Sequence, residues 1–499
     1  MSPAAPFAGL EFDNSYARLP EAFGERIEPR PVEDPGLILV NEALAGELGL
    51  DAAALASPAG VEMLAGNRLA PGSEPVAMAY AGHQFGNWVP RLGDGRALLL
   101  GEIIDRRGRR RDLQLKGSGP TRFSRGGDGR ASIGPVVREY LASEAMAALG
   151  IRTTRALAAV ATGERVLRQG GPEPGGILCR VAESHVRVGT FEYFARNGDP
   201  DAVRILADYV IERHDPDLAE HDAPYLALFE RVIDRTADLV ADWMPVGFIH
   251  GVMNTDNTSI VGETIDYGPF GFIDAFHAQT VYSSIDRGGR YAWNQQPAVA
   301  HWNLARLGEC LLPLIDASSE AALQKLNAAL ERFPDRFESR FHRNLCAKIG
   351  IEDAREGDVD LAFDLLGRMQ DASADMTLTF RRLGDLPVDH DREDGPVRAL
   401  FDAPERFDAW AVTWRERLRA QGCEDAERRA AMQRINPAFI LRNHLAQRAA
   451  DAAVERLDFE PMHKLLDVLS RPFDDQPENA EYARPPEPGE RVLETFCGT

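Results

Sequence analysis

The sequence predicts an α+β fold in which a β-rich first part, up to about residue 195, precedes a mainly helical second part. Two observations support this prediction. Residues 76–135 are rich in glycine and short apolar runs, which is typical of strands joined by tight turns. From about residue 200, apolar residues recur at the spacing of amphipathic helices. A cleft is therefore expected between the two parts.

Two strands and a helix are predicted in the β-rich part. The strands are expected at 97–104 (ALLLGEII) and 112–116 (DLQLK), joined by the basic turn DRRGRRR. Strand alternation places the two leucines of the second strand on one face and Lys116 on the other. The following segment VVREYLASEAMAAL has helical periodicity, with Pro135 at its first position and Gly150 as its C-cap.

The second part is dominated by helical patterns, interrupted by a glycine-rich, strand-like stretch at 246–276. These patterns cover 200–244, 296–332, 334–350, 357–371 and 405–450. The segment 472–489 is rich in proline and acidic residues, so it is predicted to be extended. The expected divisions are an N-terminal extension (1–75), a β-rich lobe (76–195), a helical lobe (196–471) and a C-terminal tail (472–499).

The composition excludes some classes of protein. Lys and Arg total 56 against 78 Asp and Glu in 499 residues, a formal charge of −22. This balance argues against a nucleic-acid or anionic-membrane binder, but not against ATP, whose phosphates need only a few local cations. With no apolar run long enough to span a bilayer, no secretory signal and scattered cysteines, a cytoplasmic protein is expected.

Two short features are compatible with phosphate binding. The turn Gly93-Asp94-Gly95 would let backbone amides approach a phosphate, although it could equally be a plain hairpin turn. Lys116 and Glu139, on the second strand and the following helix, match the lysine–glutamate pair of protein kinases. Without context they could also be two solvated surface charges.

Residues 247–274 carry the strongest motif. His250 is followed by a loop ending in Asn257, then by a predicted hairpin of two short strands (259–265), then by Asp266 in an Asp-Tyr-Gly sequence. Protein kinases have a metal-binding Asn and Asp in this order and at this spacing. Oxygen ligands from these two residues suit Mg²⁺ or Mn²⁺, with phosphate oxygens completing the shell.

One position departs from the kinase pattern. Kinases place a catalytic aspartate two residues after this histidine, where the chain has Val252. The protein is then either an inactive kinase or an enzyme that uses another base, such as Asp256, in a different reaction.

Further cations accompany these motifs. Arg180 and Arg187 are seven residues apart in a strand-rich region, and arginine forks match phosphate oxygens well. The segment 122–129 (RFSRGGDG) offers cations and glycines to a polyphosphate. Surface charges and a flexible exposed loop remain the alternatives for these features.

Long strings of the sequence resemble the SelO (selenoprotein O) family of protein adenylyltransferases. They are YAGHQFGNWVPRLGDGRALLLGE, DLQLKGSGPTRFSRGGDGRASIGPVVREYLASEAMAALGI, HGVMNTDNTSI with TIDYGPFGFID, GRYAWNQQPAVAHWNL and INPAFILRNHLAQ. The resemblance extends from about residue 10 to the C-terminus, and such strings are far more specific than a kinase motif.

The resemblance implies a two-lobed, protein-kinase-like fold with the nucleotide in the cleft. It implies that ATP binds in a reversed orientation and that AMP is transferred to Ser, Thr or Tyr hydroxyls of other proteins, so that Val252 need not be acidic. By motif, the nucleotide contacts are Gly93, Gly95, Arg96, Lys116, Asp128, Gly129, Arg180, Arg187 and Asp266. Likewise, Glu139 pairs with Lys116, Asn257 and Asp266 hold Mg²⁺ or Mn²⁺, and Asp256 is the base.

Family members also carry selenocysteine or cysteine near the C-terminus, which Cys497 matches. The resemblance implies a disulfide partner in the segment after the second metal ligand. Residues 275–286 contain no cysteine, and the aligned position holds Tyr282, which disfavours this internal disulfide. Pairing of Cys497 with another thiol or with glutathione remains open.

Two other functions remain as alternatives. One is a kinase-like phosphotransferase, which the valine at position 252 disfavours. The other is a catalytically silent, ATP-binding pseudokinase scaffold, which would not require a complete metal site. The sequence does not specify the acceptor proteins, the choice between ATP and UTP, or the oligomeric state.

Overall fold

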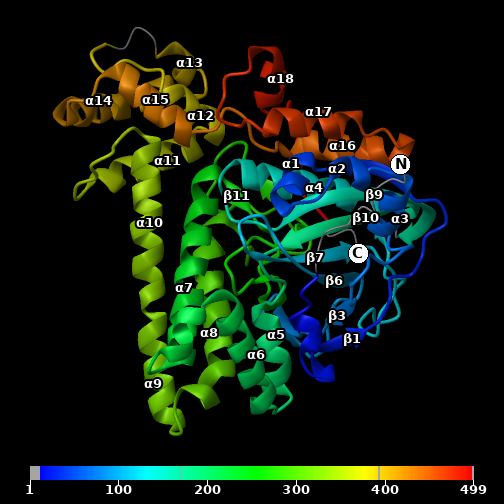
Figure 1. The fold of residues 1–499 in the computed structure, drawn as a ribbon. Helices are drawn as coiled ribbons and strands as arrows, with labels where there is room; N and C mark the ends of the chain where they lie inside the picture. The colour runs from blue at the N-terminus through cyan, green and yellow to red at the C-terminus, as the bar shows by residue number, and fades with distance from the viewer. Residues whose placement is uncertain (1–11, 169, 391–393, 497–499) are drawn as a thin grey trace.

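The computed structural model describes residues 12–168, 170–390 and 394–496, and it confirms the predicted α+β class (Figure 1). Within the described residues, one antiparallel sheet has the strand order β1-β3-β6-β7-β10-β9-β2, with β8 beside β10. Its strands are β1 (Gly24–Arg26), β2 (Gly36–Val40), β3 (Val76–Met78), β6 (Ala97–Ile104), β7 (Arg110–Lys116), β8 (Ala131–Ser132), β9 (Arg155–Arg168) and β10 (Gly171–Ala182). Two of these strands come from the first 75 residues.

The two predicted strands form the centre of the sheet. β6 has the predicted bounds, and β7 begins two residues earlier than expected, at Arg110. Leu113 and Leu115 enter an apolar core on one face, whereas Gln114 and Lys116 point to the other. The alternation in the sequence therefore orients Lys116 away from that core.

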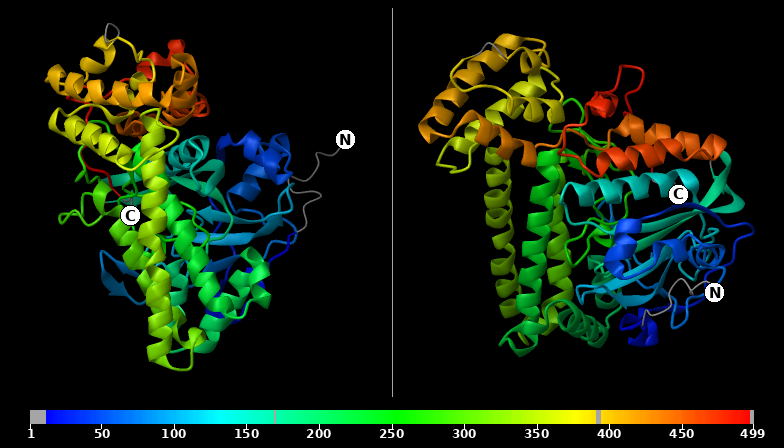
Figure 2. Two further views of the ribbon diagram at one scale, coloured as in Figure 1. Left: turned by 90° about the vertical axis from the view of Figure 1, so that its left-hand side faces the viewer. Right: turned by 45° about the horizontal axis from the view of Figure 1, so that its top comes forward.

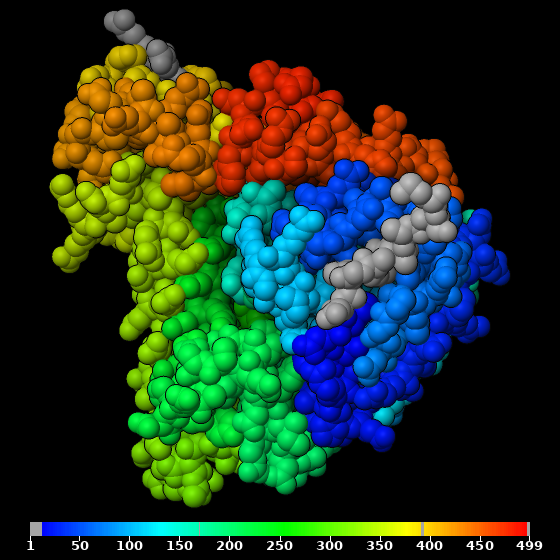
Figure 3. All heavy atoms as spheres, viewed as in Figure 1, coloured from blue at the N-terminus to red at the C-terminus, as the bar shows by residue number. Residues whose placement is uncertain are grey.

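Helices cover both faces of the sheet. The core around Leu113 and Leu115 lies beneath α1 (Glu42–Leu48), α2 (Ala52–Leu55) and α3 (Pro58–Leu64). On the other face lies the predicted helix α4 (Ile133–Ala148), covered by α16 (Asn443–Arg456) and α17 (Glu460–Leu469). It begins two residues before Pro135, and its C-cap is Leu149 rather than Gly150. The space-filling view shows these C-terminal helices lying directly against the N-terminal part (Figure 3).

The remaining helices form the rest of the molecule. They are α5 (Val188–Arg196), α6 (Pro200–His214), α7 (Pro224–Trp243), α8 (Gln296–Ile315), α9 (Ser319–Leu330), α10 (Arg332–Lys348), α11 (Asp358–Asp371), α12 (Met376–Leu383), α13 (Gly395–Arg398), α14 (Pro404–Gln421) and α15 (Asp425–Ile435). Each of the three longest predicted helical stretches contains more than one helix. In the part of the chain that the structure describes, no helix is both long and apolar enough to cross a bilayer.

A ladder of ion pairs joins α7 and α10, which run side by side in both views of Figure 2. Successive arginines and aspartates, each four residues apart, face one another. The pairs are Arg332–Asp234 (3.1 Å), Arg336–Asp238 (2.6 Å) and Arg340–Asp242 (2.7 Å). All are partly exposed, so each contributes at most about 1 kcal/mol.

The predicted hairpin at 259–265 is wrong. Ser259 instead makes a single β-bridge with Arg187, and Thr264 makes one with Thr153. The two short apolar segments therefore pair with other parts of the chain rather than with each other.

The C-terminal segment returns to the middle of the molecule. It contains the short helix α18 (Ala480–Ala483), and the backbone N–H of Thr495 donates to the carbonyl of Tyr282 at 2.7 Å. Phe496 lines a small hollow with Lys116 and Glu139. Cys497 lies outside the described residues.

Lys348, at the end of α10, is a buried cation whose charge should affect the stability of the fold. Only 3% of this residue is exposed, its ammonium lies 4.5 Å from the ring centroid of Phe380, and no carboxylate of the described residues is within ion-pair distance. Burial lowers the pKa of Lys348 to about 7. Between about pH 7 and 10 the unfolded chain binds a proton here that the folded chain does not, so this group makes stability rise with pH.

We therefore expect Lys348→Met to unfold at higher urea concentration than wild type at pH 6 to 7, and the difference to shrink as the pH rises towards 10. Urea unfolding at several pH values measures this. A pH-independent difference would mean that Lys348 is charged in the folded state.

Candidate active site

A cleft of about 500 Å³ lies where the sheet meets the helical part, and most predicted site residues line it. From the sheet side come Gly93, Gly95, Arg96, Lys116, Asp128, Gly129 and Arg180, and from the helical part come Asp256, Asn257 and Asp266. Arg187 and Glu139 do not line it. The structure thus brings ten of the twelve predicted residues to one cavity.

The glycine-containing turn forms one wall of the cleft. Gly93 has a positive φ of 67°, and a Cβ there would lie 2.2 Å from the ring of Phe123. The turn is held against the following loop by Thr121, whose hydroxyl donates to the carbonyl of Asp94 at 2.7 Å. Glycine is therefore required for this close packing, which leaves backbone rather than side chain at the wall.

Lys116 and Glu139 form the predicted ion pair. Lys116 Nζ lies 2.5 Å from Glu139 Oε2, and Arg180 donates to the other carboxylate oxygen at 3.1 Å. Gln114, opposite Arg180 in the β7–β10 register, accepts from its Nε at 3.0 Å. Glu139 therefore orients both cations from behind the cleft.

Three cations converge on Asp266. Arg180 lies 2.5 Å, Arg187 2.9 Å and Lys116 3.5 Å from its carboxylate oxygens. Burial opposes its ionisation, but these cations more than offset the burial and lower the pKa of Asp266 well below its usual range. Asp266 also has a positive φ of 61°, a conformation that costs a non-glycine residue about 1 kcal/mol or more.

Arg187 supports the site from beneath. It is 1% exposed, donates to the carbonyl of Asp256 at 2.9 Å, and lies 4.4 Å from the ring centroid of Tyr80. The sequence predicted a nucleotide contact for this residue. In the structure it joins the two acidic segments of the cleft, through the Asp256 backbone and the Asp266 carboxylate.

Asp256 is the carboxylate best suited to accept a proton. It is 7% exposed, and its Oδ1 is buried with no hydrogen-bond partner among the described residues. Burial raises the pKa of Asp256 to about 7, against the opposing effect of Arg187. A base with a pKa near neutrality is efficient at physiological pH.

A hairpin that the sequence did not predict packs on the loop of residues 250–257. Its strands are β4 (Gly82–Gln84) and β5 (Asn87–Val89). Gln84 Nε2 donates to Asp256 Oδ2 at 3.3 Å, and a Cβ on Gly82 would lie 2.5 Å from Asp256 Oδ1. The only sequence signal for Gln84 is its place in GHQFGN, within a string that resembles the family.

Asn257 and Asp266 were predicted to hold a metal ion. Asn257 Nδ2 donates to the carbonyl of Val252 at 3.0 Å, which leaves its amide oxygen available. An amide and a carboxylate oxygen are hard donors that fit Mg²⁺ or Mn²⁺. Among the described residues there is no cluster of three or more acidic, histidine or cysteine ligands, so nucleotide oxygens would have to complete the shell.

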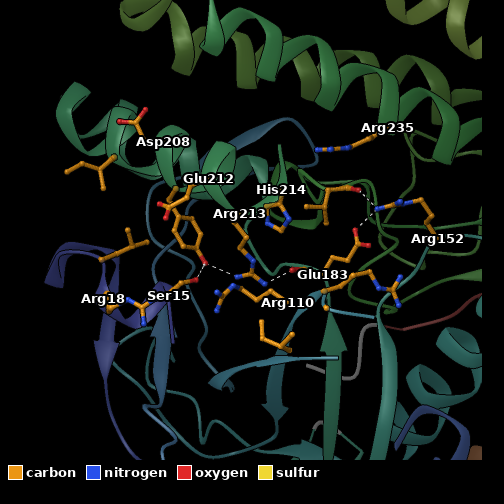
Figure 4. A pocket seen from close by; sticks show the side chains of 17 residues that line it. Ser15, Arg18, Arg110, Arg152, Glu183, Asp208, Glu212, Arg213, His214 and Arg235 are labelled. Carbon is orange, nitrogen blue, oxygen red and sulfur yellow. Dashed lines mark hydrogen bonds and ion pairs between the residues drawn. The ribbon is translucent and has the colours of Figure 1, made fainter. Parts of the chain in front are cut away.

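A larger cavity of about 900 Å³ lies elsewhere, around α6 and the β6–β7 turn (Figure 4). Six arginines line it, but each is paired with a carboxylate. The pairs are Arg18–Asp13, Arg109–Asp105, Arg110–Glu102, Arg152–Glu183, Arg213–Asp112 and Arg235–Asp215. The smaller cleft differs in that it also holds the predicted residues Asp256, Asn257 and Asp266.

Comparison with known proteins identifies the family of the chain. The family model described as "Protein adenylyltransferase SelO" matches residues 6–470. The chain is 62% identical to "Protein nucleotidyltransferase YdiU" of Alkalilimnicola ehrlichii, over the full length of both chains. It is 58% and 57% identical to the proteins of the same name from Rhodopseudomonas palustris (strain BisB5) and Methylorubrum extorquens, over 98% of this chain and 99% of each relative. The chain therefore belongs to the SelO family of protein adenylyltransferases.

Proposed function

We propose that this protein transfers AMP from ATP to Ser, Thr or Tyr hydroxyls of other proteins and releases pyrophosphate. The observation that carries this proposal is the convergence of Lys116, Arg180 and Arg187 on Asp266 in the same cleft as the buried carboxyl of Asp256. Family membership supports it. We further propose a two-lobed, kinase-like organisation with lobes at 76–195 and 196–471, an N-terminal extension (1–75) and a C-terminal tail (472–499).

The cations suit departure of pyrophosphate. In the proposed reaction the acceptor oxygen forms a bond to the α-phosphorus, and the bond from that phosphorus to the bridging oxygen of pyrophosphate breaks. Lys116 and Arg180 line the cleft and offset negative charge on the leaving group. Gly93, Gly95, Arg96, Asp128 and Gly129 are proposed to contact the rest of the nucleotide.

Asp256 takes the proton of the acceptor hydroxyl in this proposal. Val252 also lines the cleft but has no group that accepts a proton, so the carboxylate four residues later replaces the usual kinase base. Asn257 and Asp266 would hold Mg²⁺ or Mn²⁺. When bound, the divalent ion supplies further neutralisation of phosphate charge.

The test uses ATP labelled at the α or the γ phosphate, with a protein acceptor. Wild type is expected to label protein from α-labelled ATP only. Asp256→Asn, which keeps the side-chain shape, is expected to slow labelling by about 10²- to 10⁴-fold because the proton acceptor is lost. Asp242→Asn, in the α7–α10 ladder, is the matched control and should label at the wild-type rate.

Two outcomes would replace the proposal. Label from γ-labelled ATP alone would identify a phosphotransferase. Binding of ATP without labelling from either position would favour the pseudokinase scaffold.

A further inference from the structure

A cluster of aromatic rings and arginines lies next to the loop of residues 250–257. The ring of His83, on β4, is 5.1 Å from that of Trp88 and 5.3 Å from that of Trp302. Three guanidinium groups lie over the tryptophans: Arg196 over Trp88 at 5.6 Å, and Arg290 and Arg306 over Trp302 at 4.9 and 4.8 Å.

Arg290 differs from its two neighbours. Arg196 and Arg306 both pair with Glu309, at 3.5 and 2.7 Å. Across residues 12–168, 170–390 and 394–496, no carboxylate lies within ion-pair distance of the Arg290 guanidinium, and its Nε is buried without a hydrogen-bond acceptor. An arginine that is half-buried and lacks a counter-charge is costly in a folded protein. A ligand that supplies the missing carboxylate would remove this cost.

The surroundings hold Arg290 in place. The carboxylate of Asp286 accepts from the backbone N–H groups of Arg290 and Tyr291, at 2.9 and 2.8 Å. The guanidinium carbon lies 5.8 Å from the ring centroid of Tyr291 and 4.9 Å from that of Trp302. A guanidinium held between rings loses little further freedom when it binds a carboxylate.

Arg290 is also close to the proposed base. Its guanidinium carbon is 3.5 Å from where a Cβ on Gly86 would lie, at the turn of the β4–β5 hairpin. Two residues earlier in that hairpin, Gln84 contacts Asp256. Two residues of extended chain span about 7 Å at most. The next few side chains of a peptide whose hydroxyl reaches Asp256 therefore come within range of Arg290.

We propose that Arg290 binds an Asp or Glu side chain of the acceptor protein, located one to three residues from the hydroxyl that is modified. Bidentate pairing with a guanidinium favours a carboxylate over its amide. The protein has a net charge of −22, which repels acidic peptides. A preference for an acidic acceptor therefore requires a local cation such as Arg290. This inference rests on the proposed transfer to protein hydroxyls and adds the class of acceptor.

The test compares two peptides with the full-length protein. One has a central tyrosine flanked by glutamates, and the other has glutamines in their place. Binding is measured by calorimetry with a non-hydrolysable ATP analogue and Mg²⁺, and transfer is measured with α-labelled ATP. Wild type is expected to bind the glutamate peptide about tenfold more tightly. Arg290→Gln should bind the two peptides equally, because the guanidinium that distinguishes glutamate from glutamine is lost.

A charge reversal and a matched control complete the design. Arg290→Glu should prefer a lysine-flanked peptide, whereas Arg196→Gln, in the same cluster, should retain the wild-type preference. Equal binding of the two peptides by wild type, or an equal loss of preference in Arg196→Gln, would overturn the assignment of Arg290. A preference in binding without any α-label transfer would support Arg290 and refute the proposed reaction, so the two failures are distinguishable.

Discussion

Asp266→Asn is expected to reduce AMP transfer by about 10²- to 10³-fold, because a charge that organises the reacting phosphates is lost. The same change leaves Arg180 and Arg187 buried without their shared carboxylate. Removing one partner of a buried pair costs about 3–5 kcal/mol, so the free energy of unfolding should fall as well. The α-label assay measures the first effect and urea unfolding the second.

Asp105→Asn separates these two effects. Asp105 is a buried aspartate that also pairs with two arginines, Arg109 and Arg111, but it lies outside the cleft. The Asp105→Asn variant should be less stable than wild type, but its folded fraction should keep the wild-type kcat. If Asp266→Asn retains wild-type kcat when folded, the assignment of Asp266 to the reaction is wrong.

Arg442→Met is expected to cause a large loss of stability without affecting the cleft. Arg442 is 1% exposed and joins three segments: it lies 2.7 Å from Asp274 and 2.6 Å from Asp375, and donates to the carbonyl of Ala483 at 2.9 Å. Its removal leaves two aspartates facing each other in a largely buried site. The free energy of unfolding should fall by about 3–5 kcal/mol in urea unfolding at pH 7.

Arg336→Met is the control for this prediction. Arg336 makes a pair of similar length with Asp238, at 2.6 Å, but about half of its side chain is exposed. We expect a loss of less than about 1 kcal/mol. Equal losses in the two variants would show that burial of the Arg442 network does not govern its contribution.

The sequence predicted elements that local patterns determine. The strand 97–104 and the helix after Pro135 are confirmed because alternation, proline and glycine act within a few residues. The predicted hairpin at 259–265 does not form, because residues with a strand-like pattern can pair equally well with distant parts of the chain. Thr264, for example, pairs with Thr153. Local pattern does not choose between near and distant partners.

Motifs in the sequence predicted which residues meet at the cleft, but not how deeply each of them is buried or what it contacts. Arg187 was predicted to contact the nucleotide, but its packing over Tyr80 and its bonds to Asp256 and Asp266 could not be predicted from the motif. The contact between Gln84 and Asp256 joins two residues that are 172 positions apart in the sequence. Such contacts arise from the assembled fold, so no short segment predicts them.

The ladder between α7 and α10 does not by itself determine how the two helices are aligned along their length. A shift of α10 by one turn, about 5.4 Å, would place its three arginines opposite Glu230, Asp234 and Asp238, and every pair would be replaced. The correct alignment must come from contacts that do not repeat, such as Asn344 with Asp242 at 3.1 Å and the buried ring of Phe341 against Trp293. During folding, an offset helix pair would therefore keep its electrostatic energy and be rejected only when the apolar side chains interlock.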